Sequence, residues 1–284
     1  MFRFEDFPPG DRRRWEKLIE KEIGSLPEGR PHPFYMRDDV EGWETRAPLW
    51  QETGWTLVSD LYVPDEVGVW RYTEPVPQPP PRTWFIPAGA ALPAGRPGPE
   101  VEIFHQVPAE EGPSAVIGTA VWALPLRLTP ELTWEGVESL RALPPVQSLH
   151  ISLILDERFF HSILLLRSLR KALQENGLHN VQFWVQPASR LLEISPNLPG
   201  AGKEENLIRL TTYALSGILG GASYIYTPAI DREEPHAERW GRNISHILRY
   251  EVAHLFTTPD PLSGSFYIEA ETDRLAAALR AYLS

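Results

Sequence analysis

Hydrophobic and polar positions divide the chain into two halves of different character. In the second half, short apolar runs alternate with longer segments in which apolar residues recur every three to four positions. The short runs predict strands at 149–156, 181–185 and 223–227, and the longer segments predict helices at 129–143, 157–176, 204–219, 235–255 and 272–283. Strands that alternate with long helices favour βαβ units and a parallel sheet.

The ends of these helices carry local signals. Thr129 and Pro130 have the residue types that favour the cap and the first position of a helix, so they predict the start of helix 129–143. Gly177 and the pair Gly220 and Gly221 follow predicted helices and favour their termination.

The first half contains strand candidates at 55–63, 83–87, 101–107 and 114–124, separated by proline-rich segments that cannot form internal helices. The crossovers of this half are therefore predicted to be loops or very short helices. In total there are about eight strand candidates, which fits an α/β fold of the (β/α)₈ TIM-barrel type with an irregular first half. An open doubly wound sheet is the second choice, but no Gly-x-Gly-x-x-Gly follows any strand.

Residues 1–50 are predicted to form an arm, and residues 51–284 the barrel domain. A short helix is expected at 15–22, followed by several Pro and Gly residues that break regular structure. Aromatic residues recur along this arm, for example Phe34, Tyr35, Trp43 and Trp50. Such an arm must bury them either on its own barrel or on a partner subunit.

Composition excludes several classes of function. The net charge of −11 argues against a nucleic-acid-binding protein, which needs a basic face. No apolar run reaches 18 residues and no signal-peptide pattern opens the chain, so we expect a cytoplasmic protein without a membrane span. Because the chain has no cysteine, it has no thiolate nucleophile and no cysteine-ligated metal.

Motifs for chemistry are sparse. There is no HExxH zinc motif, no GxSxG nucleophile elbow and no phosphate-binding P-loop. His105 and His150 fall within predicted strands, where a hydrogen-bonded core histidine is the more common case. In a TIM barrel the sites lie at the carboxyl ends of the strands. That rule selects the candidate barrel-mouth positions Gln106, Asp156, Gln186 and Thr227, and no metal site is expected.

Four stretches of the last third occur together in a characteristic order: NLIRLTT at 206–212, Gly-Gly at 220–221 before a strand, RWGRNISHILRYE at 239–251 and DPLSGSFYIEAETD at 260–273. Because these four stretches occur in this order and at this spacing, the chain resembles the barrel domain of the methylmalonyl-CoA mutase family. WEKLIEKE at 15–22 and PFYMRDD at 33–39 are similar to the arm of that family.

The resemblance implies a barrel that works with adenosylcobalamin held by a separate domain carrying a D-x-H-x-x-G motif. This sequence contains no D-x-H, so we expect that the chain binds no cofactor alone and that adenosylcobalamin belongs to a partner chain.

Residues that the family uses for chemistry are missing. The Arg-Gly-x-Tyr stretch expected before the first strand has no counterpart between residues 40 and 54. The family ends its sixth strand near T-H-S-x-T-S, with a histidine that hydrogen-bonds the thioester carbonyl. Aligning that motif with Ser189 places Val185 at the histidine position, and valine has no group that could polarise a carbonyl.

The pattern therefore resembles the small, non-catalytic subunit of heterodimeric mutases, which would stabilise a catalytic large subunit that acts on an acyl-CoA. One alternative is the catalytic barrel of a split acyl-CoA mutase whose cobalamin domain is a separate chain. Another is a self-associating barrel that has been repurposed to bind a different small molecule.

Overall fold

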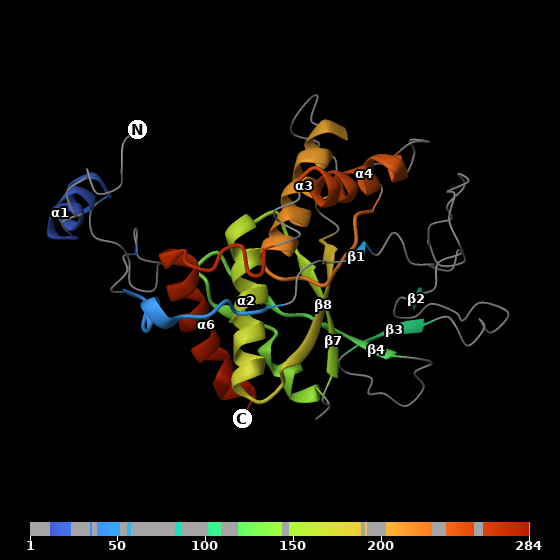
Figure 1. Cartoon of the computed structure of the whole chain (residues 1–284), viewed down its shortest axis with the longest axis horizontal. Coiled ribbons are helices and arrows are strands. Elements are labelled where there is room, and N and C mark those ends of the chain that lie inside the picture. The colour runs from blue at the N-terminus through green and yellow to red at the C-terminus, as the bar shows by residue number, and fades with distance from the viewer. Residues whose placement is uncertain are drawn as a thin grey trace.

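The computed structural model describes residues 12–23, 35, 39–51, 56–57, 83–86, 102–108, 119–143, 148–188, 191, 203–228, 237–252 and 258–283. These residues form a mixed α/β fold. Figure 1 shows helices α2 (Phe159–Glu175) and α6 (Phe266–Leu283) stacked beside the central strands of a sheet, with α3 (Lys203–Leu219) and α4 (Ala237–Tyr250) at its upper end.

The main sheet has seven strands in the order β1-β9-β8-β7-β4-β3-β2, and every pair in it is parallel. The strands are β1 (Thr56–Leu57), β2 (Thr83–Ile86), β3 (Glu102–Pro108), β4 (Thr119–Leu124), β7 (Ser148–Leu155), β8 (Asn180–Pro187) and β9 (Tyr224–Ile225). From β2 to β9 each strand of this sheet pairs with the sheet's next strand along the chain, and the first strand then pairs with the last. This order lacks the reversal of a doubly wound sheet.

The prediction of a parallel α/β sheet is thus confirmed, whereas barrel closure is not observed, because β1 and β2 remain the two edges of the sheet among the described residues. The strands at 83–86, 102–108 and 148–155 agree closely with the predicted ones. The predicted strand at 55–63 is described only at 56–57, and its remainder lies outside the described residues.

Apolar periodicity located the long helices well. Helix α2 buries one residue after another from Ile163 to Leu169, because α6 and α3 cover it as well as the sheet, and this explains its nearly continuous apolar sequence. Gly177 has φ +86° and Gly221 has φ +85°, so both adopt the left-handed conformation that terminates a helix, as the sequence predicted.

The predicted helix at 129–143 is wrong. Residues 127–135 form a hairpin instead, with β5 (Arg127–Leu128) antiparallel to β6 (Trp134–Glu135), followed by the 3₁₀ helix η6 (Val137–Ala142). The Thr129 side chain accepts a hydrogen bond from the backbone N–H of Thr133 at 3.2 Å, and this contact stabilises the turn instead of capping a helix. Gly136, at φ +76°, lies so close to the carbonyl of Pro125 that a Cβ would stand 2.4 Å from its oxygen. The last helix also differs, since α6 begins at Phe266 and not at residue 272.

The arm residues 39–51, which we call the strap, pack on the chain's own helices. They include the 3₁₀ helix η3 (Trp43–Thr45), whose tryptophan ring lies 4.5 Å from that of Phe266. The Trp50 ring lies under the guanidinium groups of Arg167 and Arg170, at 5.3 and 5.6 Å from its centroid. For this part of the arm, packing on its own domain is therefore observed.

Charged side chains fix the strap to the end of the chain. Arg46 binds Asp273 through both terminal nitrogens at 2.7 and 2.6 Å and Glu269 through Nε at 2.7 Å. The hydrogen bond that Arg46 donates to Asp273 is the largest cause that raises the pKa of Arg46. Although burial raises the pKa of Asp273, the hydrogen bonds and charges of Arg46 and Lys171 lower it below its usual value.

Helix α1 (Arg12–Ile23) is amphipathic and lies apart from the sheet at the far left of Figure 1. Among the described helices, none combines the length and apolar content that a membrane crossing requires.

Candidate functional site

The central strands β7 and β8 have two different faces. Leu149, Ile151, Leu153 and Leu155 of β7, together with Val181, Phe183 and Val185 of β8, belong to the core packed under the helices. The alternate residues point to the opposite side because side chains alternate along a strand. We call that side the polar face; it carries His150, Ser152 and Ile154 of β7 and Gln182, Trp184 and Gln186 of β8.

Ser152 links three strands of the polar face. Its Oγ accepts a hydrogen bond from Nε2 of Gln106 on β3 and another from Nε2 of Gln186 on β8, each at 3.1 Å. Ser152 is 3% exposed, so this contact is sheltered from water. The structure therefore brings together two of the four predicted barrel-mouth residues, through a serine that the prediction did not include.

Next to this contact on the polar face, His150, Trp184 and Tyr224 form a group of aromatic rings. Trp184 donates its indole Nε1–H to Nδ1 of His150 at 3.0 Å, and its ring stacks on Tyr224 of β9 with 3.7 Å between centroids and 9° between planes. Burial lowers the pKa of His150 to about 4, so the imidazole is neutral near pH 7. His150 is the hydrogen-bonded strand histidine that was expected.

Val185 lies on the other face of β8. It is fully buried, and its Cγ2 would stand 3.1 Å from a Cβ at Gly217 on α3. The Tyr213 hydroxyl of α3 donates to the Val185 carbonyl at 2.7 Å, and burial raises the pKa of that hydroxyl, which keeps its proton. A side chain at position 185 therefore faces the helices. The neighbours on the polar face are Trp184 and Gln186.

The other two predicted barrel-mouth residues do not join this group. The Asp156 carboxylate accepts hydrogen bonds from the backbone N–H of Arg158 at 2.9 Å and from its guanidinium at 2.6 and 2.8 Å, which orders the turn before α2. The Thr227 hydroxyl is buried and accepts a hydrogen bond from Ser245 of α4 at 3.1 Å. Each of these contacts connects a strand end to a helix.

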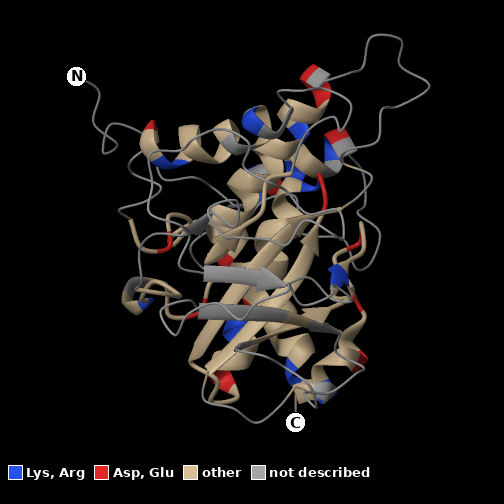
Figure 2. Cartoon of the chain, turned by 90° about the vertical axis from the view of Figure 1, so that its right-hand side faces the viewer, with Lys and Arg blue, Asp and Glu red and all other residues tan. Residues whose placement is uncertain are grey.

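The polar face offers hydrogen bonds but little charge. Figure 2 shows Lys, Arg, Asp and Glu on the helices and connecting segments, and β4, β7, β8 and β9 contain none of them. Within the part of the chain that the structure describes, no group of three or more His, Asp or Glu residues could hold a metal ion. The chemistry available here is hydrogen bonding by the amides of Gln106, Gln182 and Gln186, the hydroxyls of Ser152 and Tyr224, and a neutral imidazole.

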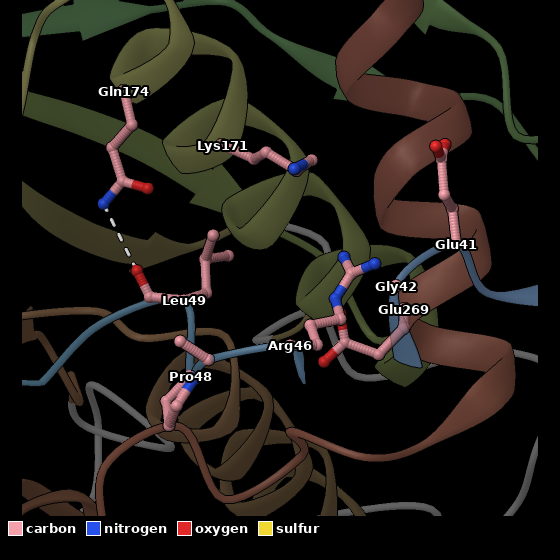
Figure 3. A pocket seen from close by; sticks show the side chains of 9 residues that line it. Glu41, Gly42, Arg46, Pro48, Leu49, Lys171, Gln174 and Glu269 are labelled. Atoms are coloured by element: carbon pink, nitrogen blue, oxygen red, sulfur yellow. Dashed lines mark hydrogen bonds and ion pairs between the residues drawn. The ribbon is translucent and has the colours of Figure 1, made fainter. Parts of the chain in front are cut away.

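Apart from the polar face, a hollow of about 280 Å³ lies between the strap and α2 (Figure 3). Its wall includes Arg46, Leu49, Lys171, Gln174 and Glu269, and Gln174 donates to the Leu49 carbonyl at 3.3 Å. Lys171 pairs with Glu175 at 2.9 Å, and Arg46 pairs with Glu269. Carboxylates of the chain already neutralise these cations. We therefore interpret the hollow as the place where the strap packs on α2, and not as a site for a charged ligand.

Three residues of the polar face were not predicted from the sequence: Ser152, Trp184 and Tyr224. The signal that could have found the first two is the period of two along β7 and β8, which places His150, Ser152, Trp184 and Gln186 on one face. Tyr224 gave no such signal, because its position opposite Trp184 depends on the pairing of β8 with β9.

Comparison with known proteins places the similarity in the last third of the chain. Residues 196–284 match the family model described as methylmalonyl-CoA mutase. The methylmalonyl-CoA mutase of Escherichia coli K12 is 38% identical over 82 residues, which are 28% of this chain and 11% of that protein. The methylmalonyl-CoA mutase small subunit of Streptomyces virginiae is 39% identical over 77 residues, which are 26% of this chain and 12% of that protein.

The matched regions thus span about a tenth of the length of these curated relatives. Residues 196–284 contain α3, α4 and α6; α3 packs on α2, β8 and β9, α4 packs on α3, and α6 packs on α2. In its C-terminal region the chain is similar to the methylmalonyl-CoA mutase family.

Proposed function

We propose that this chain is a non-catalytic subunit of (β/α)₈-barrel type that stabilises a cobalamin-dependent acyl-CoA mutase formed with a catalytic large chain. The strand order supports the barrel, because successive strands are neighbours and the first pairs with the last. The similarity to a protein named as a mutase small subunit supports the subunit role.

The observation that carries the proposal is that the hydrogen-bond donors of the polar face bind other side chains of the same chain. Gln106 and Gln186 have amide donors that could polarise a carbonyl group of a substrate. Instead, both donate to Ser152 Oγ and connect three strands of the sheet. Trp184 likewise donates to His150. These donors therefore stabilise the scaffold.

The family-like stretch at 260–273 supports the same conclusion. Asp260 and Glu269 are 2% exposed and bind Arg167 of α2. Glu269 and Asp273 bind Arg46 of the strap. The charged residues of this stretch thus hold helices and strap together, which is a structural function.

Adenosylcobalamin does not fit the residues of this chain. Its cobalt would need the histidine of a D-x-H-x-x-G motif, and the sequence contains no D-x-H. The polar face beside β8 and β9 is occupied by the stacked rings of Trp184 and Tyr224. We therefore assign the cofactor to the partner chain.

The same stacked rings disfavour a split mutase with this chain as its catalytic barrel. Such an enzyme needs free space beside the strands for the arm of an acyl-CoA. Trp184 is 1% exposed and fills the polar face at the point where β8 meets β9.

The test is purification of the tagged full chain from its native host, followed by identification of bound chains by mass. A stoichiometric large chain that carries its own mutase barrel and D-x-H-x-x-G motif is the expected result. A partner that consists only of a cobalamin domain would contradict the proposal and favour the split enzyme. A chain that recovers no mutase component would also contradict it.

A further inference from the structure

An apolar groove of about 460 Å³ lies between α3 and α4. Six of its lining residues are Leu207, Thr211, Trp240, Ile244, Ile247 and Leu248. The groove is on the outer side of the helix pair, away from the polar face, because the opposite side of α3 packs on β8 and β9. Figure 1 shows this pair at the upper end of the molecule.

Large apolar side chains continue from the groove onto the surface. Ile247 is 55% exposed and Tyr250 is 68% exposed, and they lie three positions apart on α4. Ile208 of α3 is 68% exposed, while Ile244 and Leu248, which form the buried floor of the groove, are each 6% exposed. An apolar patch on two adjacent helices is a feature of surfaces that bind another protein.

The charges beside this patch are complementary to each other. The first turn of α3 carries Glu204 and Glu205, and Glu204 also lines the groove. On α4, Arg239 is exposed and lies on the same stripe as Asn243 and Ile247, at spacings of four residues. At the amino-terminal end of the patch, α3 thus carries an acid, Glu204, and α4 carries a base, Arg239.

We infer that the α3–α4 face binds the same face of a second copy of this chain. In a two-fold contact, a residue on one copy meets the same set of residues on the other, so the patch must be complementary to itself. Facing α3 of one copy against α4 of the other joins the apolar centres and sets Glu204 toward Arg239 of the partner. The net charge of the chain is −11, and two uniformly acidic faces would repel each other. The α3–α4 face carries both an acid and a base, so two copies of it can attract each other. This inference does not rest on the proposed function.

The test is sedimentation equilibrium of the purified full chain, without any mutase partner, over a wide range of concentration. We expect a monomer–dimer equilibrium. Ile247→Glu and Tyr250→Glu should each weaken dimerisation by about 30-fold or more, because each places a charge in the apolar centre. The matched control is Tyr282→Glu, a similar change on α6 at a residue that is 39% exposed; it should leave the dimerisation constant unchanged.

Charge reversal tests the two-fold arrangement itself. Glu204→Arg and Arg239→Glu should each weaken the dimer, and the double variant should restore it. Far-UV circular dichroism and thermal unfolding check that each variant is folded.

A monomeric wild type at all concentrations would overturn the inference, as would a dimer that Ile247→Glu leaves intact. Failure of the double variant to restore binding would overturn the two-fold pairing. If Ile247→Glu instead abolished binding of a mutase large chain to a monomeric wild type, the occupant would be that chain and the inference would be wrong. Because the partner is absent from the equilibrium measurement, its result is independent of the proposed function.

Discussion

Arg167 and Asp260 form an ion pair in which both side chains are completely inaccessible to solvent, although 93 positions separate them in the chain. Arg167 also binds Glu269 at 3.1 Å, and the second oxygen of Asp260 accepts the backbone N–H of Leu49 at 2.9 Å. Asp260 has φ +40°, an unusual conformation for a residue other than glycine, which these contacts hold in place. This pair therefore joins α2, the segment before α6 and the strap.

Removing the buried carboxylate should destabilise the fold strongly. In Asp260→Ala the Arg167 guanidinium keeps Glu269 but loses its other buried anion, and the Leu49 N–H loses its acceptor. We expect the free energy of unfolding to fall by about 3–5 kcal/mol, measured by urea denaturation.

The matched control is Arg127→Ala, which breaks the pair with Glu135 on the surface hairpin, where the two side chains are 71% and 44% exposed. That change should cost less than about 1 kcal/mol. Equal losses in the two variants would show that the buried pair has no special importance.

Loss of the strap's arginine should loosen the strap locally. In Arg46→Met the contacts with Glu269 and Asp273 disappear while much of the side-chain volume remains. The Leu49 amide, which is bonded to Asp260, should then exchange its hydrogen about tenfold or more faster, because the strap opens more often. Amides in the middle of β7 should keep their exchange rates, and an unchanged rate at Leu49 would show that the other contacts of the strap hold it without Arg46.

Acid should weaken the fold through His150. Burial lowers its pKa from 6.5 to about 4, so the unfolded chain binds a proton more readily than the folded one. The contribution of this group is fully present above pH 6.5 and is lost as the pH falls toward 4. We expect a loss of about 2 kcal/mol, allowing for partial access of water to the ring.

The measurement is urea unfolding between pH 7 and 4, with the His150 ring titrated by NMR. His150→Gln should remove this part of the pH dependence. An NMR pKa near 6.5 would contradict the prediction.

Gly241→Ala should displace helix α4. A Cβ at this position would stand 2.1 Å from the carbonyl oxygen of Pro228, and backbone cannot yield as a side chain does. The variant should lose about 3 kcal/mol of stability and change the near-UV signal of Trp240. Gly217→Ala is the control, because its Cβ would meet a methyl group of Val185 at 3.1 Å; it should cost less than about 1 kcal/mol.

If the chain is a non-catalytic subunit, the polar face should be dispensable for turnover. Gln186→Ala removes one of the two donors to Ser152 and should leave the kcat of the purified mutase complex unchanged. A loss of kcat of about 100-fold or more, with the complex intact, would assign this face to the reaction.

The sequence alone determined the parallel α/β class and most of the long helices. Apolar residues that recur every three to four positions form one face only in a helix, and short apolar runs between them suit buried strands. Gly177 and Gly221 were correct because both have a positive φ, a conformation that strongly favours glycine. Helix 129–143 was wrong because the same local types, Thr129 and Pro130, also suit the hairpin turn that the structure contains. The four candidate residues were chosen by strand position alone.

Only the tertiary structure decided how those residues pair. Gln106 and Gln186 meet through Ser152 because β3, β4, β7 and β8 are adjacent in the sheet, whereas Asp156 and Thr227 are held by neighbouring turns and helices. The strap's position beside α2 and α6 depends on Arg46, Arg167, Asp260 and Glu269, which are far apart in the chain. Charged residues give no periodic signal of their partners, since a long-range ion pair exists only once the packing of the helices has brought the two groups together.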